Sequence, residues 1–174
     1  MKTVRFFNLI LWNLFRFEIW TQRILCYPLW KILNMKCVQN LYKKRGVSNP
    51  SELVLSVLSN PETSINSMYA EGHYIVLFFL LFLGLTNVFL GLLQNESHFS
   101  LVHFVLFSAM AFCVTYFISF RKDKYLRYYK EFNKLPKREK RRSAWMTFFI
   151  TVLVWVSTIV SFPIRYQGID WTKW

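Results

Sequence analysis

Three long stretches of the sequence contain no Asp, Glu, Lys or Arg. They cover residues 73–93, 101–120 and 144–164 and are rich in Leu, Phe, Val and Ile. An α-helix needs about 20 mainly apolar residues to cross a hydrocarbon core about 30 Å thick, and each stretch has that length. The absence of charge over such lengths argues against an ordinary water-soluble domain. The sequence therefore predicts an all-α integral membrane protein with three transmembrane helices.

Acidic residues are scarce, and cysteine and histidine are few. None of the nine Asp and Glu lies in an apolar stretch, whereas ion-coupled transporters carry ionisable groups at membrane depth. The sequence has no metal-binding Cys or His spacing and no Gly-rich phosphate loop. We therefore expect no enzyme activity, no cofactor and no metal. A disulfide is not expected either, because a helix would hold Cys26 and Cys37 about 16 Å apart.

Basic residues are abundant and lie on one side of the apolar stretches. Nine Lys and Arg precede the first stretch, eleven lie within 121–142, and only Arg165 and Lys173 follow the third. By the positive-inside rule, the N-terminus and the 121–142 loop are cytoplasmic and the C-terminal tail is external. Phosphates of anionic lipids attract each such residue by about 1 kcal/mol, so we expect anionic lipid as a partner. Nucleic acid, which a net charge of +13 would suggest for a soluble chain, is the less favoured partner.

Residues 1–45 are predicted to form an amphipathic, basic helical region. On a helix from residue 2 to 34 the wide apolar face is rich in aromatics, which is typical of a helix lying in the membrane interface with basic side chains reaching phosphate. Two alternatives remain: a helix packed on the transmembrane bundle with its polar stripe in water, and a fourth crossing within 6–27. The candidate lipid or partner contacts are Arg5, Arg16 and Arg23. The whole polar stripe consists of Lys2, Arg5, Asn13, Arg16, Arg23, Lys31 and Asn34.

Residues 46–72 are predicted to form a linker with short capped helices. Asn49-Pro50-Ser51-Glu52 combines an N-cap residue, a proline at the first helical position and an acid in the first turn. Asn60-Pro61-Glu62 repeats this pattern. We expect two short helices, or a helix and a turn, with a break near Pro28 in the region before them.

Residues 73–174 are predicted to form the three-helix transmembrane region, with a basic cytoplasmic hairpin at 121–143. Tyr125, Tyr129 and Phe132 recur at helical spacing, so the second crossing should continue straight into the cytoplasm for about 21 Å, until Pro136 turns the chain. The aromatic stripe is interpreted either as a seam against the N-terminal helix or the 49–58 helix, or as a docking site for a partner.

Few polar residues interrupt the apolar stretches. Intramembrane polar groups usually hydrogen-bond across helices, so Asn87 is predicted to hold helices together, with Gly84 and Gly91 allowing a close approach. The alternative is that polar residues line a pore. His103 is expected near the external surface. The candidates for packing or a pore are Asn87, His103, Thr147, Thr151 and Ser157.

Three functional hypotheses follow from these patterns. The first is a non-enzymatic structural or assembly subunit that docks cytoplasmic or membrane partners through aromatic and basic surfaces, as a homo- or hetero-oligomer. The second is an oligomeric pore-forming or membrane-perturbing effector, toxin-like or defence-associated. The third is a membrane-shaping protein that inserts a helix into one leaflet.

Overall fold

The computed structural model describes residues 2–92 and 101–167, with the side chains of 101 and 165–167 left out. Within these ranges the chain is helical and has no strand. The expected link at 94–100 and the C-terminal tail at 168–174 lie outside the described residues. The described chain contains three helical stretches long and apolar enough to cross a membrane. The prediction of an all-helical chain with three such helices is confirmed.

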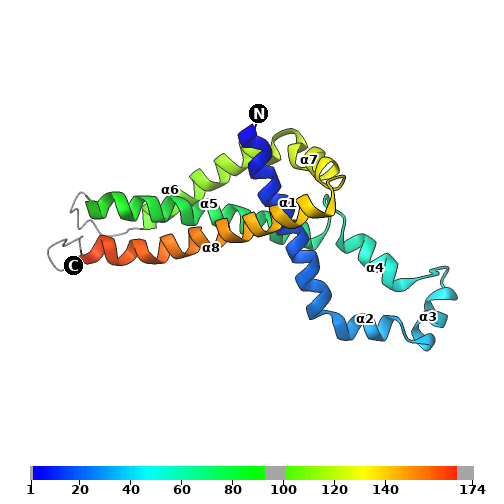
Figure 1. Ribbon diagram of the computed structural model, residues 1–174. Helices are drawn as coiled ribbons and strands as arrows, with labels where there is room; N and C mark the ends of the chain where they lie inside the picture. The colour runs from blue at the N-terminus through cyan, green and yellow to red at the C-terminus, as the bar shows by residue number, and fades with distance from the viewer. Residues whose placement is uncertain (1, 93–100, 168–174) are drawn as a thin grey trace.

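These three stretches form an elongated bundle with α5 in the middle. Helix α5 (Ile65–Leu92) packs along α8 (Lys137–Gln167) and along α6 (Leu101–Thr115) (Figure 1). Helix α5 begins at Ile65, well before its apolar stretch, because the Ser64 hydroxyl accepts a hydrogen bond from the Ser67 N–H and caps it.

Helices α5 and α8 approach each other closely at two glycines. A Cβ on Gly91 would lie 2.8 Å from the Ile164 carbonyl oxygen, and one on Gly84 would lie 3.2 Å from Thr158 Oγ1. Between these points, Asn87 is fully buried and donates from Nδ2 to Ser161 Oγ at 3.2 Å. Small residues and interhelical hydrogen bonds are the usual means of joining helices in an apolar surrounding.

The second membrane-length stretch bends, so the predicted straight extension is wrong. After α6 the chain forms a π-helical turn, η1 (Tyr116–Phe120), and a 3₁₀ turn, η2 (Arg121–Asp123), before α7 (Lys124–Phe132). Lys122 and Asp123 adopt left-handed φ angles of 59° and 50°, which end the helical path. The bend brings the aromatic face of α7 onto α1, where a straight helix would have carried it away.

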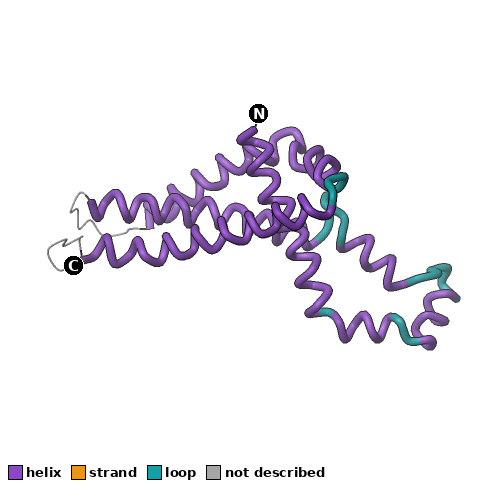
Figure 2. The backbone as a smooth tube through the Cα atoms, viewed as in Figure 1, coloured by secondary structure: helices purple, strands orange, loops and turns teal. Residues whose placement is uncertain are grey.

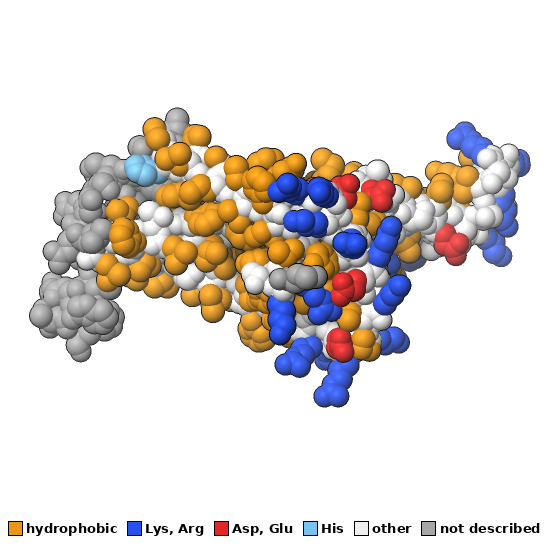
Figure 3. Space-filling view, turned by 90° about the horizontal axis from the view of Figure 1, so that it is seen from above, with side chains coloured by type: hydrophobic (Ala, Val, Ile, Leu, Met, Phe, Trp, Pro, Cys, Tyr) orange, Lys and Arg blue, Asp and Glu red, His pale blue; other side chains and the backbone are white. Residues whose placement is uncertain are grey.

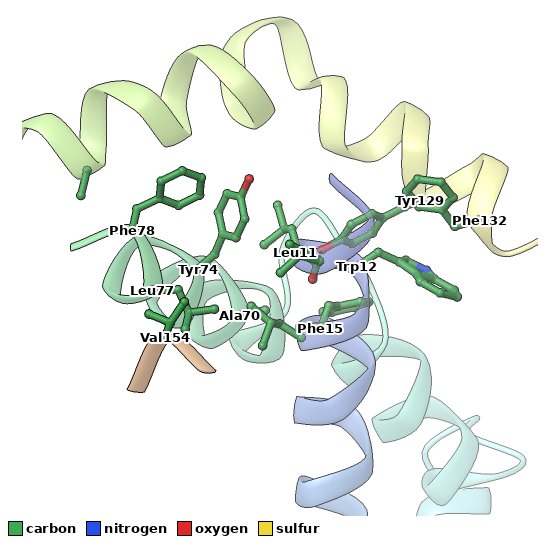
Figure 4. Packing of buried hydrophobic residues seen from close by; sticks show 13 residues of the cluster. Leu11, Trp12, Phe15, Ala70, Tyr74, Leu77, Phe78, Tyr129, Phe132 and Val154 are labelled. Carbon is green, nitrogen blue, oxygen red and sulfur yellow. Dashed lines mark hydrogen bonds between the residues drawn. The ribbon is translucent and has the colours of Figure 1, made fainter. Parts of the chain in front are cut away.

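Helix α1 (Lys2–Leu25) crosses the bundle steeply, at the end opposite the C-terminal ends of α5 and α8 (Figures 1 and 2). Its middle, from Asn8 to Phe15, is largely buried against α5, α7, α8 and η1. The hydrophobic core lies at this junction, where side chains of α1, α5 and α7 converge (Figure 4). Packing on the bundle was one of the two alternatives to a purely interfacial helix. Asn13, which the sequence placed in the exposed polar stripe, is buried instead.

Three short helices form an arm that stands off the bundle (Figure 1). They are α2 (Tyr27–Leu33), α3 (Lys36–Lys43) and α4 (Pro50–Leu58). The predicted cap is present, since Asn49 Oδ1 accepts from the Glu52 N–H at 3.4 Å and Pro50 begins α4. The second copy of the pattern is a turn, in which Asn60 Oδ1 accepts from the Glu62 N–H at 2.9 Å. Of the two expected arrangements, a helix and a turn is therefore correct.

Candidate functional site at the junction of α1, α7 and α8

Buried hydrogen bonds fix α1 against the start of the third apolar stretch. Asn13 Nδ2 donates to Thr147 Oγ1 at 3.0 Å, and the Ser143 hydroxyl donates to Asn13 Oδ1 at 3.4 Å. All three side chains are buried. Burying such groups without partners would cost free energy, so the reciprocal pairing favours this one register of α1 on α8. Thr147, one of the candidates for packing or a pore, thus forms an interhelical hydrogen bond, as a packing role requires.

A second polar contact joins α1 to the unwound turn of the second stretch. Asn8 is fully buried, and its Nδ2 donates to the Val4 carbonyl at 2.8 Å and to the Ile118 carbonyl at 3.4 Å. Ile118 belongs to η1, where the π-helical pattern displaces carbonyls from their usual α-helical partners. Lys124 Nζ donates to the neighbouring Phe117 carbonyl at 2.9 Å. The turn is thus held from both sides.

The predicted aromatic stripe of α7 is an internal seam against α1. Tyr129 and Phe132 are buried, and Figure 4 shows them beside Leu11, Trp12 and Phe15. Tyr129 stacks on Phe15 with ring centroids 5.3 Å apart, and its hydroxyl donates to the Leu11 carbonyl at 3.3 Å. These two side chains are therefore covered by α1.

Three further contacts surround this seam. Trp12 Nε1 donates to Asn133 Oδ1 at 3.2 Å, and half-buried Tyr125 forms T-shaped ring contacts with Phe120 and Tyr129. Arg5 pairs with Glu131 of α7 at 2.8 Å. Both partners of this ion pair are about half exposed, so the pair adds little stability but occupies the guanidinium.

A groove of about 750 Å³ lies between α1 and α8. Its lining includes four basic side chains, Arg16, Lys137, Lys140 and Arg141, and six apolar side chains, Leu14, Phe17, Trp20, Ala144, Phe148 and Val152. Asn13, Thr147 and Thr151 complete the lining, so Thr151 borders this groove. The arrangement suits a ligand with an anionic end and an apolar body.

Arg16 and Trp20 also border a second hollow of about 480 Å³ on the other side of α1, which Arg23 and Ser59 line as well. The Arg16 guanidinium lies 4.8 Å from the Trp12 ring centroid, in a cation–π contact that orients it. Arg16 and Arg23 are both exposed, and their contact with lipid or a partner stays a prediction.

The remaining polar candidates are not brought together. Asn87 lies between α5 and α8, and half-buried His103 lies near the start of α6, next to the undescribed link. Ser157 is exposed and donates to the Val154 carbonyl of its own helix at 3.0 Å. With Thr147 and Thr151 turned toward α1, these five residues share no common path within the described chain.

Sequence reasoning missed most of the residues at this junction. Ser143 and Thr147 are four residues apart and share a face of α8, which could have marked a partner for a polar residue. Asn8 and Asn13 gave a weaker signal, because the wide apolar face of α1 offered no reason to bury amides. Lys137 and Arg141 were taken only as part of a basic run. No group of three or more His, Cys, Asp or Glu that could hold a metal occurs in the described residues.

Comparison of the chain with protein-family models, with curated proteins and with solved structures found no match.

Proposed function

We propose that the chain is a non-enzymatic structural or assembly subunit of a membrane, with its N-terminus and residues 121–142 cytoplasmic and its C-terminus external. The three membrane-length helices and the concentration of basic residues at one end support this orientation. Seen from above, Lys and Arg side chains gather at the end of the bundle opposite the last described turns of α8, and at the tip of the arm (Figure 3). Hydrophobic side chains cover most of the bundle beside them.

The exposed apolar side chains of the arm are the main support for an assembly role. The arm extends from the basic end of the bundle, beyond α1 (Figure 1), which corresponds to the cytoplasm in the proposed orientation. Its exposed side chains include Leu29, Ile32, Met35, Leu41 and Val57. Apolar groups displayed beyond the membrane surface favour a protein partner or another copy of the chain, because either would remove them from water.

Photo-crosslinking in native membranes would test this role. A photoreactive residue at position 29 or 41 of the full chain should crosslink to another protein or a second copy. Light scattering in mild detergent should then give a particle heavier than one 21.0 kDa chain. Replacing Ile32, Met35 and Val57 together by Ser, with the photoreactive residue kept at position 29 or 41, should abolish both signals. Replacing the exposed Asn34 and Asn40 by Ser should abolish neither. A monomeric particle with no crosslink from either position would contradict the proposal.

The membrane-shaping alternative has one observation in its favour. Helix α1 lies across one end of the bundle only, and its second half exposes Phe17, Trp20 and Ile24 on one face. A helix that inserts such a face into one leaflet widens that leaflet. If the chain bends membranes, reconstitution should convert spherical vesicles into tubules in electron micrographs. Replacing Phe17 and Trp20 by Ser should then prevent tubulation.

A further inference from the structure

We propose that the groove between α1 and α8 binds one acidic phospholipid. Its phosphate would lie against Arg16, Lys137 and Arg141, and an acyl chain would follow Phe17, Trp20 and Phe148. The inference rests on the proposed membrane placement and identifies a specific lipid site within it.

Charge complementarity favours an anionic head. The lining contains four basic side chains and no Asp or Glu. Lys140 is already engaged, because its Nζ donates to the Asn133 carbonyl at 2.7 Å, and Arg16 is oriented by its contact with Trp12. Lys137 and Arg141 are exposed and form no salt bridge within the described part of the chain. Two basic groups of the groove, Lys137 and Arg141, thus remain available, beside Arg16, which lines both hollows.

The order of the lining residues along α8 matches the order of groups along a phospholipid. Lys137 and Arg141 precede residue 144, where the third apolar stretch begins, and Phe148 and Val152 follow it. At 1.5 Å per residue, the distance from Lys137 to Val152 is about 22 Å along the helix. The groove therefore runs from the level of lipid phosphate into the level of the acyl chains.

The apolar walls argue for a lipid over a free anion. Phe17, Trp20 and Phe148 are each more than half exposed, at 54%, 58% and 54%. Inorganic phosphate would leave these walls uncovered, whereas an acyl chain would cover them. The basic part would give an acidic lipid preference over a zwitterionic one, because juxtamembrane Lys and Arg attract net negative headgroups.

Native mass spectrometry of the full chain, released from mild detergent, would test the site by counting bound lipid. Phosphatidylglycerol should bind as one retained molecule, and phosphatidylcholine should bind at least tenfold more weakly. Replacing Lys137 and Arg141 by Gln should weaken phosphatidylglycerol binding by about thirtyfold, as expected for the loss of two juxtamembrane charges.

Two further variants separate this site from general surface charge. Replacing Arg138 and Arg142 by Gln removes the same charge from exposed positions of α8 that do not line the groove, and should leave binding unchanged. Replacing Ala144 by Trp keeps every charge but fills the groove, and should abolish retention. Circular dichroism should show the same helical content for all variants.

Four outcomes would overturn the inference. In the first, the two double variants weaken phosphatidylglycerol binding equally, and in the second, phosphatidylglycerol and phosphatidylcholine bind equally well. In the third, the Ala144→Trp variant still retains phosphatidylglycerol. In the fourth, inorganic phosphate alone occupies the groove and prevents phosphatidylglycerol from binding. Failure of the membrane placement would be distinguishable, because the chain would then be extracted from membranes by alkaline carbonate. Failure of the assembly role would alter only the crosslinks from the arm.

Discussion

The missing side chain of Gly91 sets how closely α5 can approach α8. Because its Cβ would lie 2.8 Å from backbone, at the Ile164 carbonyl oxygen, Gly91→Ala should destabilise the bundle by about 1–3 kcal/mol. Gly84→Ala should cost less, since the nearest atom is a side-chain hydroxyl at 3.2 Å. Gly72→Ala meets nothing within 4 Å and should stabilise α5 by about 0.5–1 kcal/mol. Thermal unfolding in detergent would rank the three variants, and equal values for Gly91→Ala and Gly72→Ala would contradict this account.

Single residues also show where sequence reasoning succeeds and where it fails. The cap at Asn49 was predictable because a helix N-terminus depends on neighbours within three residues. The sequence predicted that another helix approaches closely at Gly84 and Gly91, but it did not predict which helix this is. Asn13 was misplaced, because a polar residue on an amphipathic helix is ordinarily exposed. Only the presence of Ser143 and Thr147 on a distant helix makes its burial favourable.

The kink between α6 and α7 requires Lys122 to adopt a left-handed backbone conformation, which is unfavourable for lysine. Lys122 has φ 59°, where an L-residue other than Gly or Asn and Asp costs about 1–2 kcal/mol. Lys122→Gly should therefore raise the melting temperature despite the extra entropy of glycine in the unfolded chain. Arg121 has φ −57°, so Arg121→Gly gains nothing and should lower it. A lower melting temperature for Lys122→Gly would indicate that the lysine side chain outweighs the strain.

Docking of α7 on α1 depends on buried aromatic side chains. Phe132 is 1% exposed, and Phe132→Ala should remove about 3–5 kcal/mol of packing free energy. We expect α7 to detach while the three long helices remain paired, because Phe132 lies outside the α5–α8 contact. Hydrogen exchange of residues 124–132 should accelerate strongly. Lys130→Ala, at an exposed position of the same helix, should leave the exchange rates unchanged, and unchanged rates in Phe132→Ala would sink the prediction.

Long helices were predictable as elements, whereas their bends were not. The apolar stretches fixed where α5, α6 and α8 would lie because length and absence of charge act locally along the chain. Continuous helical spacing through 121–135 predicted one straight helix, since spacing carries no information on left-handed residues such as Lys122 and Asp123. Contacts of η1 and α7 with α1 favour the bend, and such tertiary contacts cannot be read from the local sequence.

At the scale of the whole molecule, orientation in the membrane is the feature to test. We expect reporters placed after residue 2 and near Lys134 to be cytoplasmic and a reporter after Trp174 to be external. The physical reason is the 20-to-2 distribution of Lys and Arg on the two sides of the bundle. Paired alkaline phosphatase and green fluorescent protein fusions would measure this. A cytoplasmic C-terminus would contradict three crossings, because two termini on the same side of the membrane require an even number.

The candidate lipid groove could not be predicted from the sequence as a site. Its two walls are more than 100 residues apart in the chain, with Arg16 and Trp20 on one and Lys137 and Arg141 on the other. Each wall alone resembles an ordinary amphipathic or basic segment. Only the crossing of α1 over α8, fixed by Asn13, joins them into one amphipathic surface.

The buried middle of α1 has a consequence for the order in which the chain is made. Asn8, Leu11, Trp12 and Asn13 form hydrogen bonds with residues 118, 129, 133 and 147, and these four partners are synthesised more than 100 residues later. Helix α1 can therefore complete these hydrogen bonds only after the start of α8 has been made, although its packing on α5 can form earlier. The complete docking of α1 thus depends on α8, the last of the three membrane-length helices along the chain, being in place.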